Sequence, residues 1–446
     1  MPAIAAEDRL TGIAAVPSAP IADGFTLAAV GDIIYLRPML STIERQSPDM
    51  LRLLRSADAT FGNFETTVAD LQHFEGAPQA ESGGTWMLAD PGVVADVRAM
   101  GFDIVSFANN HVADWGVEGL RETTRRLDEA GLVHAGAGRN LSAARAPRYL
   151  DLPAGRVALV AATSTFTPMS RAADGWGEVP GRPGVNALRT EQITLVDAGD
   201  LRVLARIAGT KPGQPVVLND ARYAARKAGE TAGSKYGVDA ADEAGNILSV
   251  RQAKQNGNLV LFSLHNHEPD TDSETPADFA VKVAHDVIDG GADIFIGHGP
   301  HRLRGIEIYK GRPIFYSLGN FAMMNNSLDA LPPDMYEEYG VAPGKTTTAE
   351  FLQARNGREF SDRDLYESVI AVNRYVHGHV SEIRLYPIDL GISKQGAARG
   401  VPALAGAAVG RRTLERLQRL SRPFGTRIAI ENGMGIIRVA ADRDDR

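Results

Sequence analysis

Short apolar runs rich in β-branched residues alternate with longer amphipathic segments from residue 25 onward. This alternation predicts strands separated by helices, and therefore an α/β or layered α+β domain. Two stretches with helical character, 116–131 and 276–291, each end in glycine, as helix C-termini often do. The predicted strands are 25–31, 59–64, 103–109, 156–163, 258–264, 293–297, 313–318 and 381–388.

Two long stretches interrupt this pattern. Residues 165–256 include the Pro- and Gly-rich segment GWGEVPGRPG, and residues 323–366 include ALPPDMYEEYGVAPGKTTT. Irregular segments of this length are usually functional or disordered, so we interpret both as insertions over a site, with the segment around Trp176 as a covering loop. The sequence thus predicts one domain over 25–446, with insertions at about 165–256 and 323–366, after a flexible tail over 1–24.

Composition narrows the class of protein. The 446 residues are 44% hydrophobic and 23% charged, which is typical of a soluble globular enzyme. The net charge of −8, without clusters of Lys and Arg among aromatics, argues against a nucleic-acid partner. The absence of cysteine excludes disulfides, thiolate metal sites and cysteine nucleophiles, and leaves the redox compartment open.

The N-terminal segment is too polar and too often broken by proline for a signal peptide or a membrane span. We therefore expect a soluble protein without a transmembrane segment. Its expected location is cytoplasmic or, if a signal peptide has been removed, exported to the periplasm. The oligomeric state is not predicted by the sequence.

Five of the predicted strands end in polar clusters. In open α/β sheets, ligands bind outside the carboxyl ends of the strands, so we expect these clusters to converge on one place. Taken singly, each residue has an ordinary explanation, such as a turn or a helix cap. The clusters contain Asp32; Asn63 and Glu65; Asn109, Asn110 and His111; His265, His267 and Glu268; and His298 and His301.

The donor types in these clusters suit a divalent metal site. A pair of ions needs roughly eight to ten donor atoms, including a bridging carboxylate. Oxygen and imidazole donors fit one or two ions of Mn, Zn, Fe, Mg or Ca. His265 and His267 alternate at a strand end and should face opposite ways, so we favour His265 as the ligand. The expected ligands are Asp32, Glu65, Asn110, His265, His298 and His301.

The clusters lie within longer motifs. Along the chain these read AVGDI, GNFET, SFANNHVADWG, SLHNHE, GADIFIGHGPHRLRGIEIYKGRPIFYSLGNF and HVSEIRLYPIDL. In order and spacing they resemble the poly-γ-glutamate capsule synthesis proteins of the CapA type, which are relatives of the calcineurin-like metallophosphoesterases. The resemblance covers roughly residues 25–165 and 258–390. It implies a four-layer αββα sandwich with two mixed sheets.

The resemblance also implies roles for the acids. Asp32 matches the aspartate of the first metallophosphoesterase motif, and Glu65 matches the bridging acid of the second. The first motif of those enzymes reads Asp-x-His, whereas Ile34 stands at the histidine position here. Loss of this nitrogen donor favours a single tight ion, or a harder ion with oxygen ligands, and disfavours phosphoester hydrolysis.

The remaining motifs supply the nitrogen donors on the same resemblance. Asn110 and His111 match the Asn-His pair of the third motif, in which Asn binds metal and His acts as an acid or electrophile. His265 matches the single histidine of the fourth motif. His298 and His301 match the two histidines of the last.

Our leading hypothesis is a metal-dependent hydrolase of an amide or peptide-like bond, with a γ-glutamyl bond as one candidate. A metal-activated water would attack the polarised carbonyl. The expected catalytic residues are His111, His267 and Asn109, with His111 or His267 handling the proton.

The expected substrate is a small peptide-like or polyglutamate-like molecule. Arg302 or Arg304, beside the last motif, are candidates to bind its carboxylate, although surface arginine is the simpler interpretation of each. Asn63 and Glu268 complete the expected substrate-binding set.

Three alternatives stay open. The same residues suit a metal-dependent peptide epimerase, in which flanking bases remove and return an α-proton. Fold analogy alone favours a phosphodiesterase. A non-catalytic protein that assembles or binds capsule polymer is the third alternative.

Overall fold

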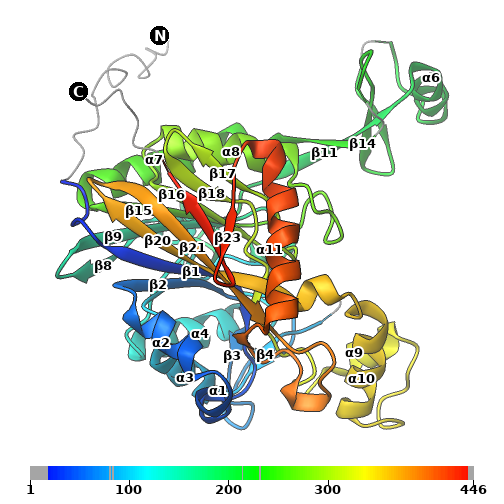
Figure 1. Cartoon of the computed structure of the whole chain (residues 1–446). Coiled ribbons are helices and arrows are strands. Elements are labelled where there is room, and N and C mark those ends of the chain that lie inside the picture. Colours follow the sequence, from blue (N-terminus) through cyan, green and yellow to red (C-terminus); the bar gives the residue numbers. More distant parts are fainter. Residues whose placement is uncertain (1–18, 80–81, 83–84, 213, 231–232, 440–446) are drawn as a thin grey trace.

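The computed structural model describes residues 19–79, 82, 85–212, 214–230 and 233–439, and shows a mixed α/β fold with two large sheets (Figure 1). The mixed α/β class expected from the sequence is confirmed. Residues 1–18 of the expected tail lie outside the described residues. Residues 19–24 contact the domain: Ile21 is buried, and Gly24 N donates to Tyr375 O at 2.8 Å.

The first sheet has ten strands in the order β23-β24-β21-β20-β1-β2-β5-β6, with β19 also paired to β1 and β22 to β21. Strands β1, β2, β5 and β6 run parallel, while β20 joins the other edge of β1 in antiparallel fashion. The strands are β1 (Thr26–Ile34), β2 (Ala59–Phe64), β5 (Ile104–Ser106), β6 (Val133–Ala135), β19 (Asn320–Met323), β20 (Glu367–Val376), β21 (His379–Asp389), β22 (Ala403–Leu404), β23 (Ala429–Glu431) and β24 (Met434–Arg438).

The second sheet has six strands in the order β17-β18-β16-β15-β9-β8. Its central strands β9, β15, β16 and β18 are parallel, so their carboxyl ends meet at one edge. The strands are β8 (Arg148–Leu152), β9 (Gly155–Thr163), β15 (Leu259–His265), β16 (Ile294–His298), β17 (Ile306–Tyr309) and β18 (Arg312–Phe315).

The two sheets share one buried core. Alternate residues of β1, such as Leu27 and Ala29, cluster with Leu159 of β9 and Leu261 of β15. The intervening residues of both sheets point the other way, into two further cores that the helices cover. The near-continuous apolar sequence of these strands therefore follows from burial of both sheet faces.

Helices cover the outward cores. The predicted helices 116–131 and 276–291 correspond to α4 and α8. The α-helices of the body are α1 (Leu40–Gln46), α2 (Pro48–Ser56), α3 (Gly92–Met100), α4 (Gly116–Glu129), α5 (Leu141–Arg145), α7 (Ala240–Asn256), α8 (Asp278–Asp289) and α11 (Ala407–Ser421). None of the described helices is both long and apolar enough to span a membrane.

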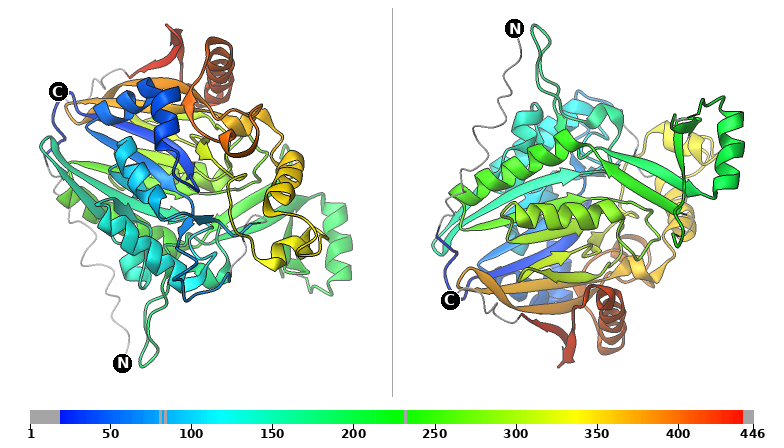
Figure 2. Two further views of the ribbon diagram at one scale, coloured as in Figure 1. Left: turned by 90° about the horizontal axis from the view of Figure 1, so that it is seen from below. Right: turned by 90° about the horizontal axis from the view of Figure 1, so that it is seen from above.

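The first irregular stretch contains regular structure that the sequence did not reveal. A four-stranded sheet in the order β12-β13-β11-β14 carries α6 (Ala198–Ile207) and projects from the body as an arm (Figure 1, Figure 2). Its strands are largely solvent-exposed, so their sequences lack the apolar runs of the core strands. They are β11 (Thr190–Val196), β12 (Val216–Leu218), β13 (Ala221–Ala225) and β14 (Gly233–Val238).

The second irregular stretch contains α9 (Pro333–Glu338) and α10 (Thr348–Glu359). Met335 and Phe351 anchor these helices to the core beside the first sheet. Helix α10 begins with a capping box between Thr347 and Glu350, a local signal that fixes its start.

Candidate metal centre

Strand ends bring the predicted polar residues together. Asp32 lies in β1, paired in register with Asn63 of β2, and Glu65 follows that strand. His265 ends β15 and His298 ends β16, and the two are register partners in parallel strands. Because parallel neighbours end at the same edge, each sheet gathers its own polar side chains, and contact between β1 and β16 brings the two sets together.

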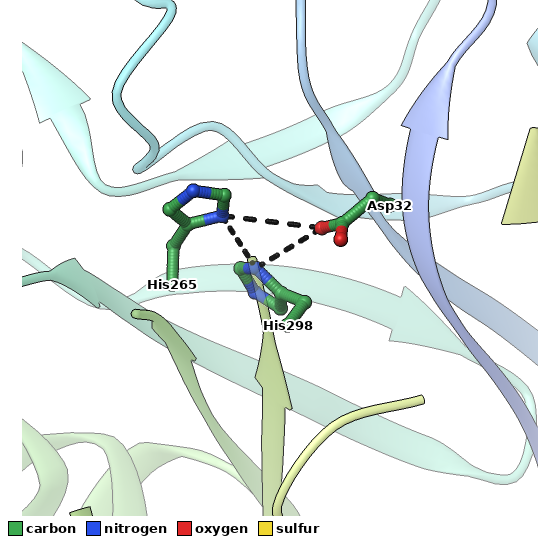
Figure 3. Close-up of side chains that lie close together, drawn as sticks. All are labelled: Asp32, His265 and His298. Carbon is green, nitrogen blue, oxygen red and sulfur yellow. Dashed lines mark hydrogen bonds and ion pairs between the residues drawn. The ribbon is translucent and has the colours of Figure 1, made fainter. Parts of the chain in front are cut away.

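Asp32 faces two imidazoles across a small triangle of donor atoms (Figure 3). Its Oδ1 lies 3.6 Å from Nδ1 of His298 and 3.9 Å from Nδ1 of His265, and these two nitrogens are 3.0 Å apart. On the other side, Oδ2 lies 3.3 Å from Nδ1 of His301. Three imidazole nitrogens therefore surround one fully buried carboxylate.

Glu65 forms the opposite wall of the cluster. Its Oε1 is buried and has no hydrogen-bond partner among the described residues. Three Nε2 atoms face it, from His265 at 3.8 Å and from His301 and His111 at 4.0 Å. An unsatisfied buried carboxylate oxygen is costly, and a cation among these atoms would satisfy it.

Asn110 and His267 also reach the cluster. Oδ1 of Asn110 lies 2.8 Å from Nε2 of His265, and Nε2 of His267 lies 3.2 Å from the same nitrogen. The expectation that His267 faces away from His265 is wrong, because β15 ends at His265 and strand alternation does not continue to His267.

The donor set fits a divalent metal. The residues form three groups, and within each group the potential ligand atoms lie within 4.8 Å of one another. Asp32, Glu65 and His265 each belong to two of the groups. Mixed carboxylate and imidazole donors suit Zn, Mn or Fe, and carboxylates that belong to two groups are suited to bridging a pair of ions. The groups are Asp32, His265 and His298; Glu65, His265 and His267; and Asp32, Glu65 and His301.

Burial sets the charge state of these groups. Burial lowers the pKa of His265 and His267 well below the ordinary value, and that of His298 to about 4. Burial opposes ionisation of Asp32 too, but the hydrogen bond and charge of His301 outweigh it and hold the pKa of Asp32 below its usual range. Burial and the charge of Asp32 raise the pKa of Glu65. Neutral imidazoles are the form that binds metal.

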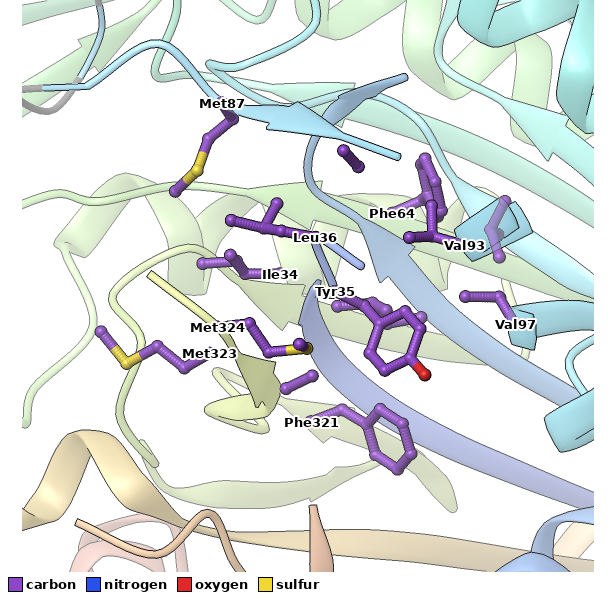
Figure 4. Close-up of a cluster of buried hydrophobic side chains, with 14 of the residues drawn as sticks. Ile34, Tyr35, Leu36, Phe64, Met87, Val93, Val97, Phe321, Met323 and Met324 are labelled. Carbon is purple, nitrogen blue, oxygen red and sulfur yellow. The ribbon is translucent and has the colours of Figure 1, made fainter. Parts of the chain in front are cut away.

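Ile34 stands where the resemblance to metallophosphoesterases would place a histidine. Its side chain is fully buried in an apolar cluster that includes Met323 and Met324 (Figure 4). The pairing of β1 with β19 shifts register between Asp32 and Ile33, at the point where the strand passes the cluster. On this backbone, an imidazole at position 34 would lie among apolar side chains.

The backbone around His301 adopts uncommon conformations. His301 has φ +59°, a left-handed conformation that is uncommon for residues other than glycine and is often found at functional sites. Gly299, at φ +114°, donates its N–H to Oδ2 of Asp32 at 3.0 Å. These contacts tie the last motif to the first.

Two polar residues that contact histidines of the cluster were missed by sequence reasoning. Oδ1 of Asn320 lies 3.0 Å from Nδ1 of His301, and Oγ of Ser263 lies 2.6 Å from Nε2 of His298. Partners of this kind fix the tautomer and the ring orientation of a ligating histidine. The only signal for Asn320 was its place in the motif YSLGNF, and Ser263 had none.

His111 is held by an acid that was also missed. Nδ1 of His111 lies 2.7 Å from Oδ2 of Asp114, which also accepts from Met87 N at 2.6 Å. Both side chains are buried, and Nε2 of His111 is left facing Glu65. The three-residue spacing in NNHVAD was a weak signal for this pair.

Asn63 and Asn109 brace the acids. Nδ2 of Asn63 donates to Oδ1 of Asp32 at 2.9 Å and to Oε2 of Glu65 at 3.3 Å. Nδ2 of Asn109 donates to the side chain of Asn63 and to Phe64 O. These contacts favour a positioning role for both residues, whose expected catalytic and substrate roles remain predictions.

The other predicted substrate-binding residues contact loops beside the cluster. Arg304 is fully buried and donates to three carbonyl oxygens, of Glu268, Asp270 and Ser273, so it shapes the loop after β15. Oε2 of Glu268 accepts from Ser164 at 2.8 Å and from Thr165 at 3.3 Å.

Arg302 is the better candidate of the two arginines for a substrate carboxylate. Its side chain pairs with Asp272 at 2.9 Å and with Asp362 at 3.2 Å, and both partners are themselves substantially exposed. Its Nε is buried with no hydrogen-bond partner among the described residues.

The segment around Trp176 forms a hairpin that projects from the body (Figure 2). Asp174 in this hairpin accepts from N and Oγ of Ser142 at 2.9 Å, which ties it to α5. Trp176 itself is 88% exposed. Its expected role over the site remains a prediction.

We expect the metal-free protein to lose stability as the pH falls from about 7 to 4. Buried His265 and His298 and half-buried His267 resist protonation, whereas histidines of the unfolded chain take up protons near pH 6.5. The unfolded state then binds more protons, so the free energy of unfolding decreases on acidification. The shift of His298 to about 4 alone corresponds to about 3 kcal/mol.

Glu65 acts in the opposite direction, because its raised pKa lets the folded state keep a proton that the unfolded chain lacks. The effect of this one group on the free energy of unfolding opposes the effect of the three histidines. Urea unfolding of chelator-treated protein between pH 7.5 and 4.5 measures the balance, and Glu65→Gln should steepen the loss. A His377→Gln variant, altered at a side chain that is 84% exposed, should follow the parent profile. A flat profile would contradict the assignment.

Comparisons with known proteins give the family context of this site. The family model described as bacterial capsule synthesis protein PGA_cap matches residues 26–325. An uncharacterized protein (y4sH) of Sinorhizobium fredii is 45% identical over 437 residues, which are 94% of each chain.

Two named relatives are more distant. The capsule biosynthesis protein CapA of Bacillus anthracis is 27% identical over 307 residues, which cover 66% of this chain and 59% of that protein. A probable polyglutamine synthesis accessory protein of Mycobacterium tuberculosis is 28% identical over 268 residues, which cover 59% of this chain and 55% of that protein.

Proposed function

Because the chain belongs to the bacterial capsule synthesis protein family PGA_cap, we propose that it is a metal-dependent hydrolase of an amide or peptide-like bond, with a γ-glutamyl bond as the first candidate. The names of two relatives, which refer to capsule biosynthesis and polyglutamine synthesis, support a glutamyl substrate. Within this proposal the fold is the four-layer αββα sandwich of the metallophosphoesterase type. Two sheets that share a core, with helices on their outer cores, support it.

One observation carries the proposal. Oε1 of Glu65 is buried without a hydrogen-bond partner and faces three imidazole nitrogens at 3.8–4.0 Å, opposite the carboxylate of Asp32. A divalent ion held by these residues would polarise a substrate carbonyl and lower the pKa of a water molecule. The ligands would be those of the three donor groups, with Asn110 as a further oxygen donor.

The residues of the chain would divide the remaining work. Nδ1–H of His111 donates to Asp114, which leaves Nε2 unprotonated at the cluster. Nε2 would accept the proton that the attacking water loses and then pass it to the leaving amine. His267, whose Nδ1 lies 3.1 Å from Oγ1 of Thr271, is held at the other side of His265. Asn63 and the N–H of Gly299 keep Asp32 in place by hydrogen bonds.

Epimerisation is a second candidate, because His111 and His267 place two bases at one cluster, as removal and return of an α-proton requires. The two reactions differ in the fate of substrate that is not cleaved. Hydrolysis leaves its α-carbon untouched, whereas epimerisation exchanges the α-proton with solvent.

The test incubates the protein with α-linked and γ-linked glutamyl peptides in deuterated water, with Mn or Zn added. We expect peptide cleavage that chelation abolishes and metal restores, and no deuterium in the uncleaved peptide. Deuterium in uncleaved peptide would replace hydrolysis by epimerisation as the main activity. Turnover of generic phosphodiesters without peptide cleavage would establish a phosphodiesterase, and metal binding without any turnover would favour a binding or assembly role.

A further inference from the structure

The outer end of the arm presents apolar side chains that the chain does not cover. Helix α6 lies farthest from the two large sheets in all three views (Figure 1, Figure 2). Leu201 and Leu204 are half-buried on one side of the helix, which contacts β12 and β13. Val203 and Ile207, one helical turn apart, are 45% and 62% exposed, and Val217 of β12 is 42% exposed.

Cations accompany these apolar side chains. Arg202 and Arg206 are exposed and are also one turn apart, each directly preceding one of the exposed apolar residues, and Lys211 follows the helix. Among the described residues, none of the three makes an ion pair. Asp200 is the one exposed acid within the helix.

The arm differs in charge from the rest of the chain. Residues 190–238 contain seven Lys and Arg and five Asp and Glu, a net charge of +2, whereas the whole chain carries −8. The remainder therefore carries −10. An anionic surface would attract the arm and repel the body, and this difference would orient the molecule with α6 toward that surface.

We propose that the end of the arm, formed by α6 and Lys211, docks on the surface of an anionic lipid bilayer. A helix with apolar and basic side chains together on its exposed side is the pattern of interfacial membrane binding. The apolar side chains would enter the boundary between headgroups and acyl chains. Each cation close to an anionic surface strengthens binding roughly fivefold.

The size of the patch favours a bilayer over a second copy of the chain. A stable protein interface buries about 800 Å² on each partner, usually from 20 to 30 residues. Among the described residues of the arm, the exposed large apolar side chains are Val203 and Ile207 of α6 and Val217 of β12. Shallow insertion assisted by charge needs only such a small apolar group, provided that several cations accompany it.

Co-sedimentation of the full chain with lipid vesicles tests the proposal. We expect at least roughly tenfold more binding to phosphatidylglycerol-containing vesicles than to pure phosphatidylcholine, with most of it lost at high salt. Ile207→Asp should lower binding about tenfold or more, and Arg202→Glu combined with Arg206→Glu should reduce it to the level of neutral vesicles.

Two matched control variants replace exposed apolar side chains that lie outside the arm. Leu248→Asp alters a residue of α7 that is 61% exposed, and Trp176→Ala alters the hairpin. Both variants should bind vesicles as the parent does, and thermal unfolding should show that all variants are folded.

Three results would overturn the proposal: equal binding to neutral and anionic vesicles, no binding to either, or binding that Trp176→Ala removes and Ile207→Asp does not. Concentration-dependent self-association that Ile207→Asp abolishes, without vesicle binding, would assign this face to a second copy instead.

Discussion

Replacing His265 by alanine is expected to abolish tight metal binding. His265 belongs to two of the three donor groups and contacts both walls of the cluster, since its two nitrogens lie 3.9 Å from Asp32 and 3.8 Å from Glu65. Without His265, each of those two groups would keep only two protein donors. A catalytic divalent site commonly uses three. We expect affinity for the ion to fall by about 100-fold or more, because even substitutions of the outer partners of ligands cost 10- to 100-fold.

Elemental analysis after purification and thermal unfolding with and without added metal measure this effect. The parent should hold at least about one ion per chain and gain stability with excess metal, since an ion that binds only the folded state stabilises it. The variant should show neither property. A His285→Ala variant, altered on α8 away from the donor groups, is the control and should behave as the parent does. Unchanged metal content in the folded His265→Ala protein would refute the assignment of the centre.

Much of the site could be predicted because its residues lie near the ends of strands that the local sequence reveals. Each predicted ligand lies near the end of a buried strand or shortly after it, and apolar runs are the clearest strand signal in a sequence. Once the strands of each sheet are assigned as parallel neighbours, their carboxyl ends must meet, so Asp32 approaches Glu65 in the first sheet and His265 approaches His298 in the second. Packing of the two sheets, which places β1 against β16, then brings the two pairs together, and strand assignment alone does not give this step. The structure brings all six predicted ligands into one cluster.

The parts that could not be predicted depend on contacts between distant residues or on exposure. The strands of the arm are mostly exposed, and β12 has only three residues, so β11 to β14 lacked the long apolar runs that mark the core strands. The orientation of His267 depends on where β15 ends, and strand boundaries are poorly encoded locally.

Sequence analysis missed the residues that contact the histidines of the cluster for a different reason. Asn320, Ser263 and Asp114 act through other side chains and are common residue types without a diagnostic spacing. Only coordinates show that each lies within hydrogen-bond distance of a histidine of the cluster.

Replacing His111 by glutamine is expected to lower kcat by about 100- to 10,000-fold while metal content stays unchanged, the range by which a positioned proton donor accelerates a reaction. His111 belongs to none of the donor groups, yet its Nε2 lies 4.0 Å from Oε1 of Glu65. It can therefore reach a leaving group at the centre without holding the ion. Elemental analysis beside steady-state kinetics on the cleaved peptide separates the two roles, and loss of metal with activity would make His111 a ligand instead.

Asp114→Asn is the matched test of how His111 is oriented. The acid accepts from Nδ1 of His111, so an amide in its place weakens the hold on the tautomer that leaves Nε2 free for proton transfer. We expect kcat to fall while KM changes little, with the pH profile of kcat displaced because the neighbouring negative charge is gone. A merely structural role for Asp114 would lower thermal stability and leave that profile in place. Since Asp114 Oδ2 also accepts from Met87 N, the unfolding temperature must be measured with the pH profile, and only displacement of the profile in a folded protein supports proton transfer by His111.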